Sequence, residues 1–340
     1  MAQDKEPQIG NRQLAIGNKF IRWGLIGCGD IAQKRVAPAL AASPNSELVA
    51  VSRANTSRLD EFADRFRVRF RFNHWQQLVQ SEDVDAVYVA TPVNLHAEQT
   101  IAALESGKHV LCEKPMALNV AECEQMISAA TSRGLHLGIA YYRHFYPVVR
   151  RMKQVIESGE IGKPIVAQVT AFEWFNPAPS NPRAWLLKPE ISGGGPMFDF
   201  GCHRIQLLLH LFGPVKSVSA VTATALFNRE VEDTAVASFE FSQGTIGNLV
   251  VSHAAMEPRD SFTVYASEGT MSVDVLNQGR LVVTTRDGNR AEALPPAQNI
   301  HQPLIEDFVQ AVIEDREPLV TGEIGKAVAE IEAEIFHRGR

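Results

Sequence analysis

The chain has 340 residues, with 33 basic and 39 acidic side chains and a formal net charge of −6 at pH 7. This length is sufficient for two domains with separate cores. No basic cluster suggests a nucleic-acid surface, and no apolar run is long enough to span a membrane. The four cysteines lie far apart without Cys-x-x-Cys spacing, which argues against a disulfide framework or a metal site.

The first nineteen residues differ in composition from the rest. Residues 1–19 are polar and mixed in charge, without the apolar segment of a secretory signal. We expect this segment to be a flexible arm that precedes a soluble, cytoplasmic protein.

A glycine turn follows the first apolar run. The run, residues 20–26, ends at Gly27, and a helical pattern begins at Asp30. Glycine allows the tight turn, and Gly29 has no side chain to keep a pyrophosphate from the backbone. Free N–H groups and the helix dipole then attract phosphate. An ordinary strand-to-helix turn is the alternative, but the pattern favours dinucleotide binding at Gly27, Gly29, Asp30 and Ile31.

The second strand ends where such a fold recognises the adenosine ribose. An NAD-selective site places Asp or Glu there, whereas this chain has Ser52 and Arg53. A guanidinium suits a 2′-phosphate by its charge and its forked donors. The alternative is that Arg53 and Arg58 are solvated surface residues. The missing carboxylate favours NADP as the cofactor, with NAD as the alternative.

Strands and helices alternate through the first part of the chain. We expect helices over 57–67, from 74, over 94–106 and over 120–132, the first capped by Thr56 and the third by Asn94. The expected strands cover 47–52, 69–72, 85–90, 108–115 and 135–140. This alternation predicts a parallel sheet with right-handed crossovers, a Rossmann domain over 20–141. Its ligands bind at the carboxyl ends of the strands.

The pattern changes after residue 141. A helix over 147–157 precedes longer alternating runs, which predict an open, largely antiparallel sheet of about six or seven strands. The runs cover 165–175, 215–227, 233–241, 245–253, 261–266, 270–275 and 280–285. We expect residues 142–340 to form an α+β domain for substrate binding and oligomerisation, with one face of the sheet free to pair with another subunit. Helices within 303–338 are expected to pack back on the first domain.

Two motifs carry the expected chemistry. Lys114, in Glu113-Lys114-Pro115, follows a strand, where its ammonium can hold a substrate oxygen and stabilise alkoxide charge. Asp199 and His203 are four residues apart, so they share a helical face. Histidine titrates near neutral pH and can accept a hydroxyl proton, and the carboxylate can orient the substrate or the imidazole. A surface lysine, a capping aspartate and a core histidine are the alternatives.

These motifs together resemble the Gfo/Idh/MocA family, from about residue 20 to the C-terminus. The matching features are the Gly27/Gly29 loop, Thr-Pro-x-Asn-x-His at 91–96, Glu-Lys-Pro at 113–115 and Asp-x-x-x-His at 199–203. The resemblance implies a Rossmann domain, an open-faced second domain, and dimers or tetramers. It also implies that Lys114, Asp199 and His203 are catalytic. The cofactor contacts expected beyond the glycine loop are Ser52, Arg53, Thr91, Pro92, Asn94, His96, Glu113 and Lys114.

Substrate contacts are expected in two segments. The loop over 172–185 carries Trp174, Arg183 and Trp185, and Tyr142-Arg143 stands where family members often have Asn-Arg. Aromatic faces and hydrogen-bonding groups suit a sugar or cyclitol ring, although a packed aromatic loop would look the same.

The sequence therefore predicts an NAD(P)-dependent oxidoreductase that acts on a hydroxyl-bearing carbon of a sugar, cyclitol or related polyol, without a metal. Two alternatives share the fold. One is a glycosidase that uses the cofactor without net redox change, and the other is a cofactor-sensing regulator without catalysis. The joint presence of Lys114, Asp199 and His203 argues against the regulator.

Overall fold

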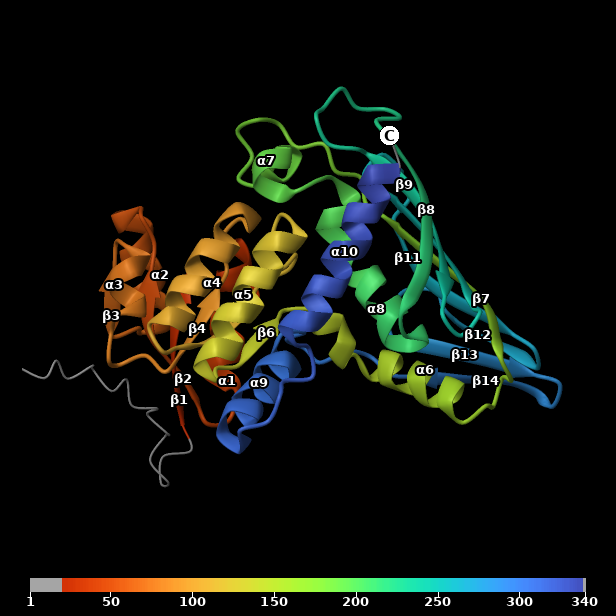
Figure 1. Cartoon of the computed structure of the whole chain (residues 1–340), viewed down its shortest axis with the longest axis horizontal. Coiled ribbons are helices and arrows are strands. Elements are labelled where there is room, and N and C mark those ends of the chain that lie inside the picture. The colour runs from red at the N-terminus through yellow and green to blue at the C-terminus, as the bar shows by residue number, and fades with distance from the viewer. Residues whose placement is uncertain (1–19, 339–340) are drawn as a thin grey trace, which may run out of the picture.

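The computed structural model describes residues 20–338, so the expected arm over 1–19 lies outside the described residues. Two β-sheets with their helices lie side by side along the long axis of the molecule (Figure 1). The smaller sheet comes from the first part of the chain and the larger sheet from the second. The fold class predicted from the sequence, a Rossmann fold followed by an α+β unit with a largely antiparallel sheet, is confirmed.

The first sheet has six parallel strands in the order β3-β2-β1-β4-β5-β6. Trp23 and Leu25 of β1 are fully buried because helices cover both faces of this sheet. The strand order reverses between β1 and β4, and ligands of open parallel sheets bind at that point, beyond the carboxyl ends. The strands are β1 (Ile21–Ile26), β2 (Ser46–Ser52), β3 (Phe70–Phe72), β4 (Ala86–Val89), β5 (His109–Cys112) and β6 (Leu137–Ile139).

The crossover helices follow the sequence pattern, with two corrections at their first residues. Helix α2 is capped by Asn55, whose side chain accepts from the Arg58 N–H at 3.0 Å, and not by Thr56. Asn94 does not cap α4, because it lies inside a 3₁₀ turn whose tighter bonding delays the α-helix to His96. The helices are α1 (Ala37–Ala42, preceded by π-helical Ala32–Val36), α2 (Thr56–Phe66), α3 (Trp75–Val79), α4 (His96–Glu105) and α5 (Val120–Arg133).

The second sheet has eight strands in the order β14-β13-β12-β11-β7-β10-β9-β8. Among the described strand pairs of this second sheet, only β7 and β10 pair in parallel. Strand β14 was not predicted, because its sequence Gly-Asn-Arg-Ala-Glu-Ala lacks β-branched and aromatic residues. The strands are β7 (Pro164–Phe172), β8 (Val215–Ala223), β9 (Thr234–Phe241), β10 (Ile246–Ser252), β11 (Arg259–Ala266), β12 (Gly269–Val273), β13 (Arg280–Thr285) and β14 (Gly288–Ala293).

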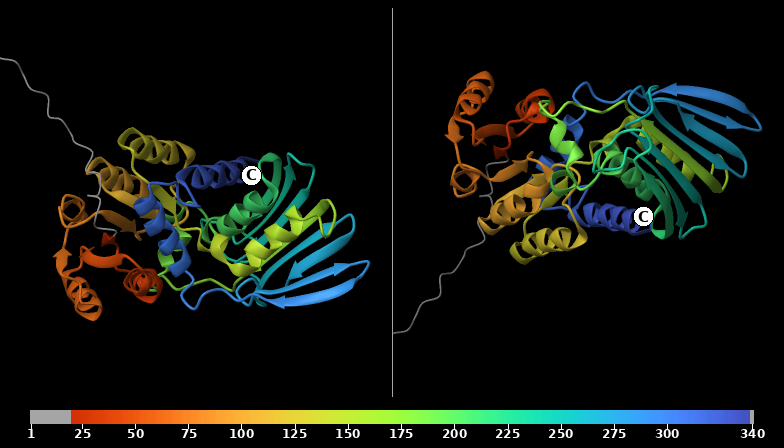
Figure 2. Two further views of the ribbon diagram at one scale, coloured as in Figure 1. Left: turned by 90° about the horizontal axis from the view of Figure 1, so that it is seen from below. Right: turned by 90° about the horizontal axis from the view of Figure 1, so that it is seen from above.

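Helices cover one face of this larger sheet (Figure 2). Helix α6 (Pro147–Glu157) packs near β13, α8 (Cys202–Phe212) lies beneath the same face, and α10 (Gly322–Arg338) packs on β8. Side chains alternate along the strands, so that Phe239, Leu249 and Phe262 are buried against the helices. Their neighbours along each strand point to the opposite face and are only partly buried.

The C-terminal segment contacts both layers. Helix α9 (Gln302–Glu314) packs on α1, and α10 packs on α5 and β6 as well as on α8 and β8. Between these helices, the Ile139 N–H of β6 donates to the Val320 carbonyl at 3.0 Å, and Gly138 pairs with Thr321. The segment between α9 and α10 therefore satisfies the outer edge of the first sheet.

Among the described residues, no helix combines the length and the apolar composition that a membrane crossing requires.

Candidate active site

The glycine turn has the geometry that a dinucleotide requires. Gly27 has φ +94°, and a Cβ there would lie 2.6 Å from the Ala90 carbonyl oxygen of the neighbouring strand end. Gly29, by contrast, faces open space, with no atom within 4 Å of a Cβ placed on it. Asp30 pairs with Lys34 at 2.9 Å at the start of the helix. The turn therefore leaves the backbone accessible where a pyrophosphate is expected.

Arg53 lies over this turn. Its Nη1 donates to the carbonyl of Cys28, between the two glycines. Ser52 is buried, and its carbonyl accepts the Gly27 N–H at 3.1 Å. The side chain that follows β2 and contacts the glycine turn is therefore a cation.

The loops after β4 and β5 are joined by His96. This imidazole is fully buried, with Nδ1 2.9 Å from the Pro115 carbonyl and Nε2 2.9 Å from the Thr91 carbonyl. Both ring nitrogens contact the protein backbone, so His96 fixes the relative position of two loops that the sequence assigned to cofactor binding.

Glu113 is held from two sides. Its carboxylate accepts from the Tyr88 hydroxyl at 2.9 Å and lies 3.3 Å from Nε2 of His301, at the start of α9. Burial alone would raise the pKa of Glu113, but the contacts with His301, Lys114 and Tyr88 outweigh it and lower the pKa. The segment after β5 that carries Lys114 is thereby anchored to the C-terminal segment.

Lys114 and Asp199 meet although they come from different layers. The Lys114 ammonium donates to the Asp199 backbone carbonyl and lies 3.7 Å from Oδ1 of its carboxylate. Burial alone would lower the pKa of Lys114, but acidic neighbours including Asp199 and Glu113 outweigh it and raise the pKa. The ammonium therefore stays charged and available to an oxygen anion.

Asp199 lies in a short π-helical segment, Met197–Gly201, just before α8. Besides Lys114, its carboxylate faces Arg183 at 3.7 Å and Nε2 of His253 at 3.4 Å. Burial would raise the pKa of Asp199, but the contact with His253 and the charges of Lys114 and Arg183 lower it to about 2. The carboxylate is thus anionic, and it is surrounded by donors.

His203 is the buried imidazole next to these charges. Its ring centroid lies 4.6 Å from that of Tyr142 and 5.7 Å from that of Tyr141, and its Nδ1 has no protein partner. Burial, followed by the charges of Lys114 and Arg143, lowers the pKa of His203 well below its usual value. The imidazole is therefore neutral near pH 7 and able to accept a proton.

Arg143, predicted as a substrate contact, pairs with a largely buried carboxylate. It is buried, and its Nη1 lies 3.1 Å from Oδ2 of Asp260, whose other oxygen accepts from Arg204. Burial would raise the pKa of Asp260, but the two guanidinium groups lower it. The charge of Arg143 is thus compensated inside the protein.

Of the remaining predicted substrate residues, some contact the cluster around Asp199 and His203 and others do not. Arg183 contacts Asp199 directly and lies over the ring of Phe175, 4.4 Å from its centroid. Tyr142 contacts the His203 ring. Trp174 is exposed and packs edge-on against Phe227 instead, and Trp185 lies partly exposed in a 3₁₀ turn.

Sequence reasoning missed several members of the cluster. His253 ended a predicted strand and was not considered as a site residue, although the end of a strand is a common place for one. The others carried no local signal, because their partners are distant in the sequence: Arg204, Arg229, Asp260 and His301.

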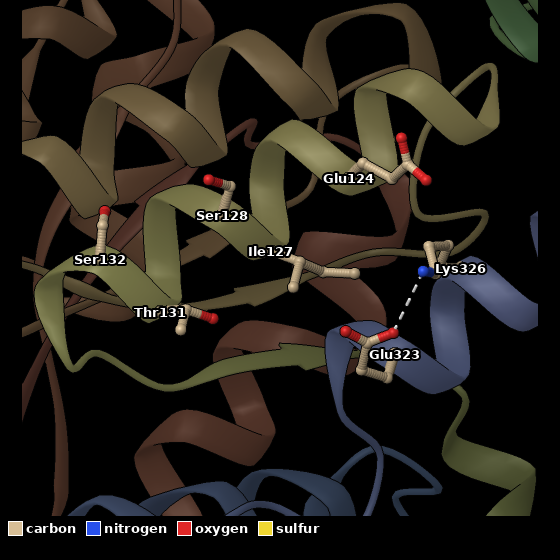
Figure 3. A pocket seen from close by; sticks show the side chains of 7 residues that line it. All are labelled: Glu124, Ile127, Ser128, Thr131, Ser132, Glu323 and Lys326. Atoms are coloured by element: carbon tan, nitrogen blue, oxygen red, sulfur yellow. Dashed lines mark ion pairs between the residues drawn. The ribbon is translucent and has the colours of Figure 1, made fainter.

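A shallow groove between α5 and α10 contains none of the predicted site residues (Figure 3). Its side chains include Ile127 and the ion pair of Lys326 with Glu323, 3.5 Å apart. Within residues 20–338 no three His, Cys, Asp or Glu side chains are arranged to hold a metal ion.

Comparison with known proteins agrees with this architecture. Residues 21–141 match the oxidoreductase family with an NAD-binding Rossmann fold, and residues 149–272 match the GFO/IDH/MocA C-terminal domain. The chain is 30% identical to 1,5-anhydro-D-fructose reductase of Ensifer adhaerens over 89% of this chain and 92% of that protein. It is 28% identical to myo-inositol 2-dehydrogenase of Thermotoga maritima, over 90% of this chain and 92% of that protein.

The solved structure of a levoglucosan dehydrogenase in complex with NADH has a TM-score of 0.86 and 25% identity, covering 94% of this chain and 97% of that one. The glycine turn, the strand order and the charged cluster thus define a dinucleotide-binding oxidoreductase. The chain belongs to the Gfo/Idh/MocA family, as the motifs predicted.

The buried Asp260 gives a test of the site's electrostatics. Asp260→Asn should lower the free energy of unfolding by about 3–5 kcal/mol, because it leaves Arg143 and Arg204 buried without an anion. Urea denaturation measures this change, with Asp287→Asn on an exposed turn as the matched control. Equal stability of the two variants would contradict the buried charge pair.

Proposed function

We propose that the protein is an NAD(P)-dependent oxidoreductase that transfers a hydride between the nicotinamide and a hydroxyl-bearing carbon of a sugar, cyclitol or related polyol. The observation that carries this proposal is the meeting of Lys114, Asp199 and His203, from different layers, in one buried cluster. The names of the relatives, which include a sugar reductase and a cyclitol dehydrogenase, support the substrate class.

The three residues have separate tasks in the oxidation direction. His203, neutral at physiological pH, accepts the proton of the substrate hydroxyl at its imidazole. The Lys114 ammonium binds the same oxygen and stabilises the negative charge that develops on it. Asp199 keeps that ammonium in place and compensates its charge. The bound cofactor supplies the hydride acceptor, to which the C–H electron pair of the substrate passes.

The cofactor fits the chain's own residues. Gly29 leaves the open space that a pyrophosphate needs, and Arg53 lies over the same turn. No carboxylate follows β2 to accept from a ribose hydroxyl, since the strand ends in Ser52 and Arg53. These features support NADP as the preferred cofactor, bound through its 2′-phosphate by Arg53.

We also propose that the uncovered face of the large sheet pairs with a second copy in a dimer or tetramer. Three adjacent strands, β7, β10 and β9, present uncharged side chains to it: Gln168, Thr170, Val236, Ser238, Asn248 and Val250. An uncharged surface of this kind is suited to a two-fold contact.

Lys114→Ala tests the catalytic assignment. It should lower kcat by about 10²–10⁴-fold, because alkoxide stabilisation in the transition state is lost. The affinity for the nicotinamide cofactor should be largely kept. Turnover is measured as nicotinamide absorbance over a panel of polyols, and affinity is measured by fluorescence titration. Lys163→Ala, at an exposed lysine, is the control, and wild-type turnover of the Lys114 variant would dismiss the assignment.

Arg53→Ala tests the cofactor preference. We expect it to weaken the binding of NADPH by about 1.5–3 kcal/mol, the range for hydrogen bonds to charged groups. The binding of NADH should be weakened much less. Fluorescence titration with both cofactors measures the difference, and Arg65→Ala on the exposed side of α2 serves as the control. Equal weakening of both cofactors would mean that Arg53 makes no contact with a 2′-phosphate.

The oligomer is tested by Val250→Arg. A charge in the centre of the proposed contact should convert the wild-type oligomer to monomers in analytical ultracentrifugation, because it would be buried without a partner. Gln125→Arg, which adds the same charge at an exposed position of α5, is the control. A wild-type monomer, or an unchanged oligomer in the Val250 variant, would refute this interface.

A further inference from the structure

His253 is held rigidly at the end of β10. Its imidazole is fully buried and contacts the rings of Phe175 and Phe200, with centroid distances of 5.0 and 5.2 Å. Its backbone N–H donates to the Asp233 carbonyl at 2.7 Å, and its own carbonyl accepts from the Phe175 N–H at 2.9 Å. Backbone and ring are therefore fixed together.

The contact with Arg229 determines which ring nitrogen of His253 carries the proton. The guanidinium Nη2 lies 3.1 Å from Nδ1 of His253, and the same side chain donates to the carbonyls of Phe175 and Glu232 at 3.0 and 2.7 Å. Arginine has only donors, so Nδ1 of His253 must be the acceptor. The proton of the neutral imidazole is then on Nε2.

This Nε2 atom faces the Asp199 carboxylate. It lies 3.4 Å from Oδ2, on the side of the carboxylate shared with Arg183, while Lys114 lies 3.7 Å from Oδ1. Both Nε2 and Oδ2 are buried and neither forms a regular hydrogen bond among the described residues, so the contact between them is electrostatic. The imidazole that Asp199 contacts is therefore His253. His203 packs against Tyr141 and Tyr142, and its Nδ1 has no protein partner.

We infer that His253 is a positioning residue, whose Nε2–H, fixed by Arg229, holds the Asp199 carboxylate in the orientation that directs Oδ1 toward Lys114. The inference rests on the proposed function, in which Lys114 binds the reacting oxygen. It assigns the two imidazoles of the cluster to different tasks, since His253 orients Asp199 and His203 exchanges the proton.

The contact also has an electrostatic consequence. Three groups face the Asp199 carboxylate, namely Lys114 from the end of β5, Arg183 from the loop after β7, and His253 from the end of β10. The His253 contact is the leading influence that lowers the pKa of Asp199 against its burial. Without the Nε2–H, the pKa of Asp199 is higher. As the pH is lowered, the carboxylate is then protonated earlier, and the activity that needs its anion is lost at a higher pH than in the wild type.

A pair of amide variants separates orientation from packing. The amide nitrogen of His253→Gln takes the place of Nε2, whereas that of His253→Asn reaches only the place of Nδ1, beside Arg229. We expect His253→Asn to lose about 10–100-fold in kcat, the range for misplaced catalytic geometry. KM for the cofactor should not change, and the acid limb of the pH profile should move to higher pH. His253→Gln, by contrast, should keep most of the wild-type kcat and the acid limb of the wild-type pH profile.

Imidazole ¹⁵N spectra of histidine-labelled wild-type protein test the same inference without activity. The His253 signals, assigned by their absence in His253→Gln, should show a protonated Nε2 and an unprotonated Nδ1. A protonated Nδ1, or equal kcat and pH profiles for both amide variants, would overturn the inference. A wild-type protein that turns over no polyol would instead refute the proposed function, and the spectra would still decide the tautomer.

Discussion

The contact between Lys114 and Asp199 is the constraint on which the site depends. The lysine ends a parallel strand of one sheet, and the aspartate precedes a helix that covers the other. The ammonium is bound by both the backbone carbonyl and the carboxylate of Asp199. Breaking a partly buried pair of this kind leaves an uncompensated charge, which is strongly unfavourable. The two layers are therefore held together where the segment after β5 meets the segment before α8.

Much of this arrangement could be predicted because its signals are local. Gly27 needs a positive φ, and its place after a buried strand is visible in a few residues. The alternation of strands and helices defines the parallel sheet by general rules of handedness. The order of four short motifs then indicated the family. Lys114, Asp199 and His203 were all proposed this way; in the structure Lys114 contacts Asp199, and its charge acts on His203.

The remaining features depend on partners that are distant in the sequence. Nothing near Arg143 shows that Asp260 takes its charge, and nothing near His253 shows that it faces Asp199. Strand β14 forms because β13 offers an edge, not because of its own propensity. The errors at Thr56 and Asn94 have another origin. Neighbouring polar residues compete for one cap, and a 3₁₀ turn can displace the cap of a helix by one residue, here from Asn94 to Leu95.

The path of the C-terminal segment sets the true limit of the cofactor-binding half. Val320 and Thr321 complete the edge of β6, and α10 covers α5 before it reaches β8. A fragment that stops near residue 141 keeps all six parallel strands, yet it exposes an unpaired edge and an apolar helix face. The boundary near residue 141 thus divides the sequence but not the folded structure. The nucleotide-binding half is completed only when the last helix has been synthesised.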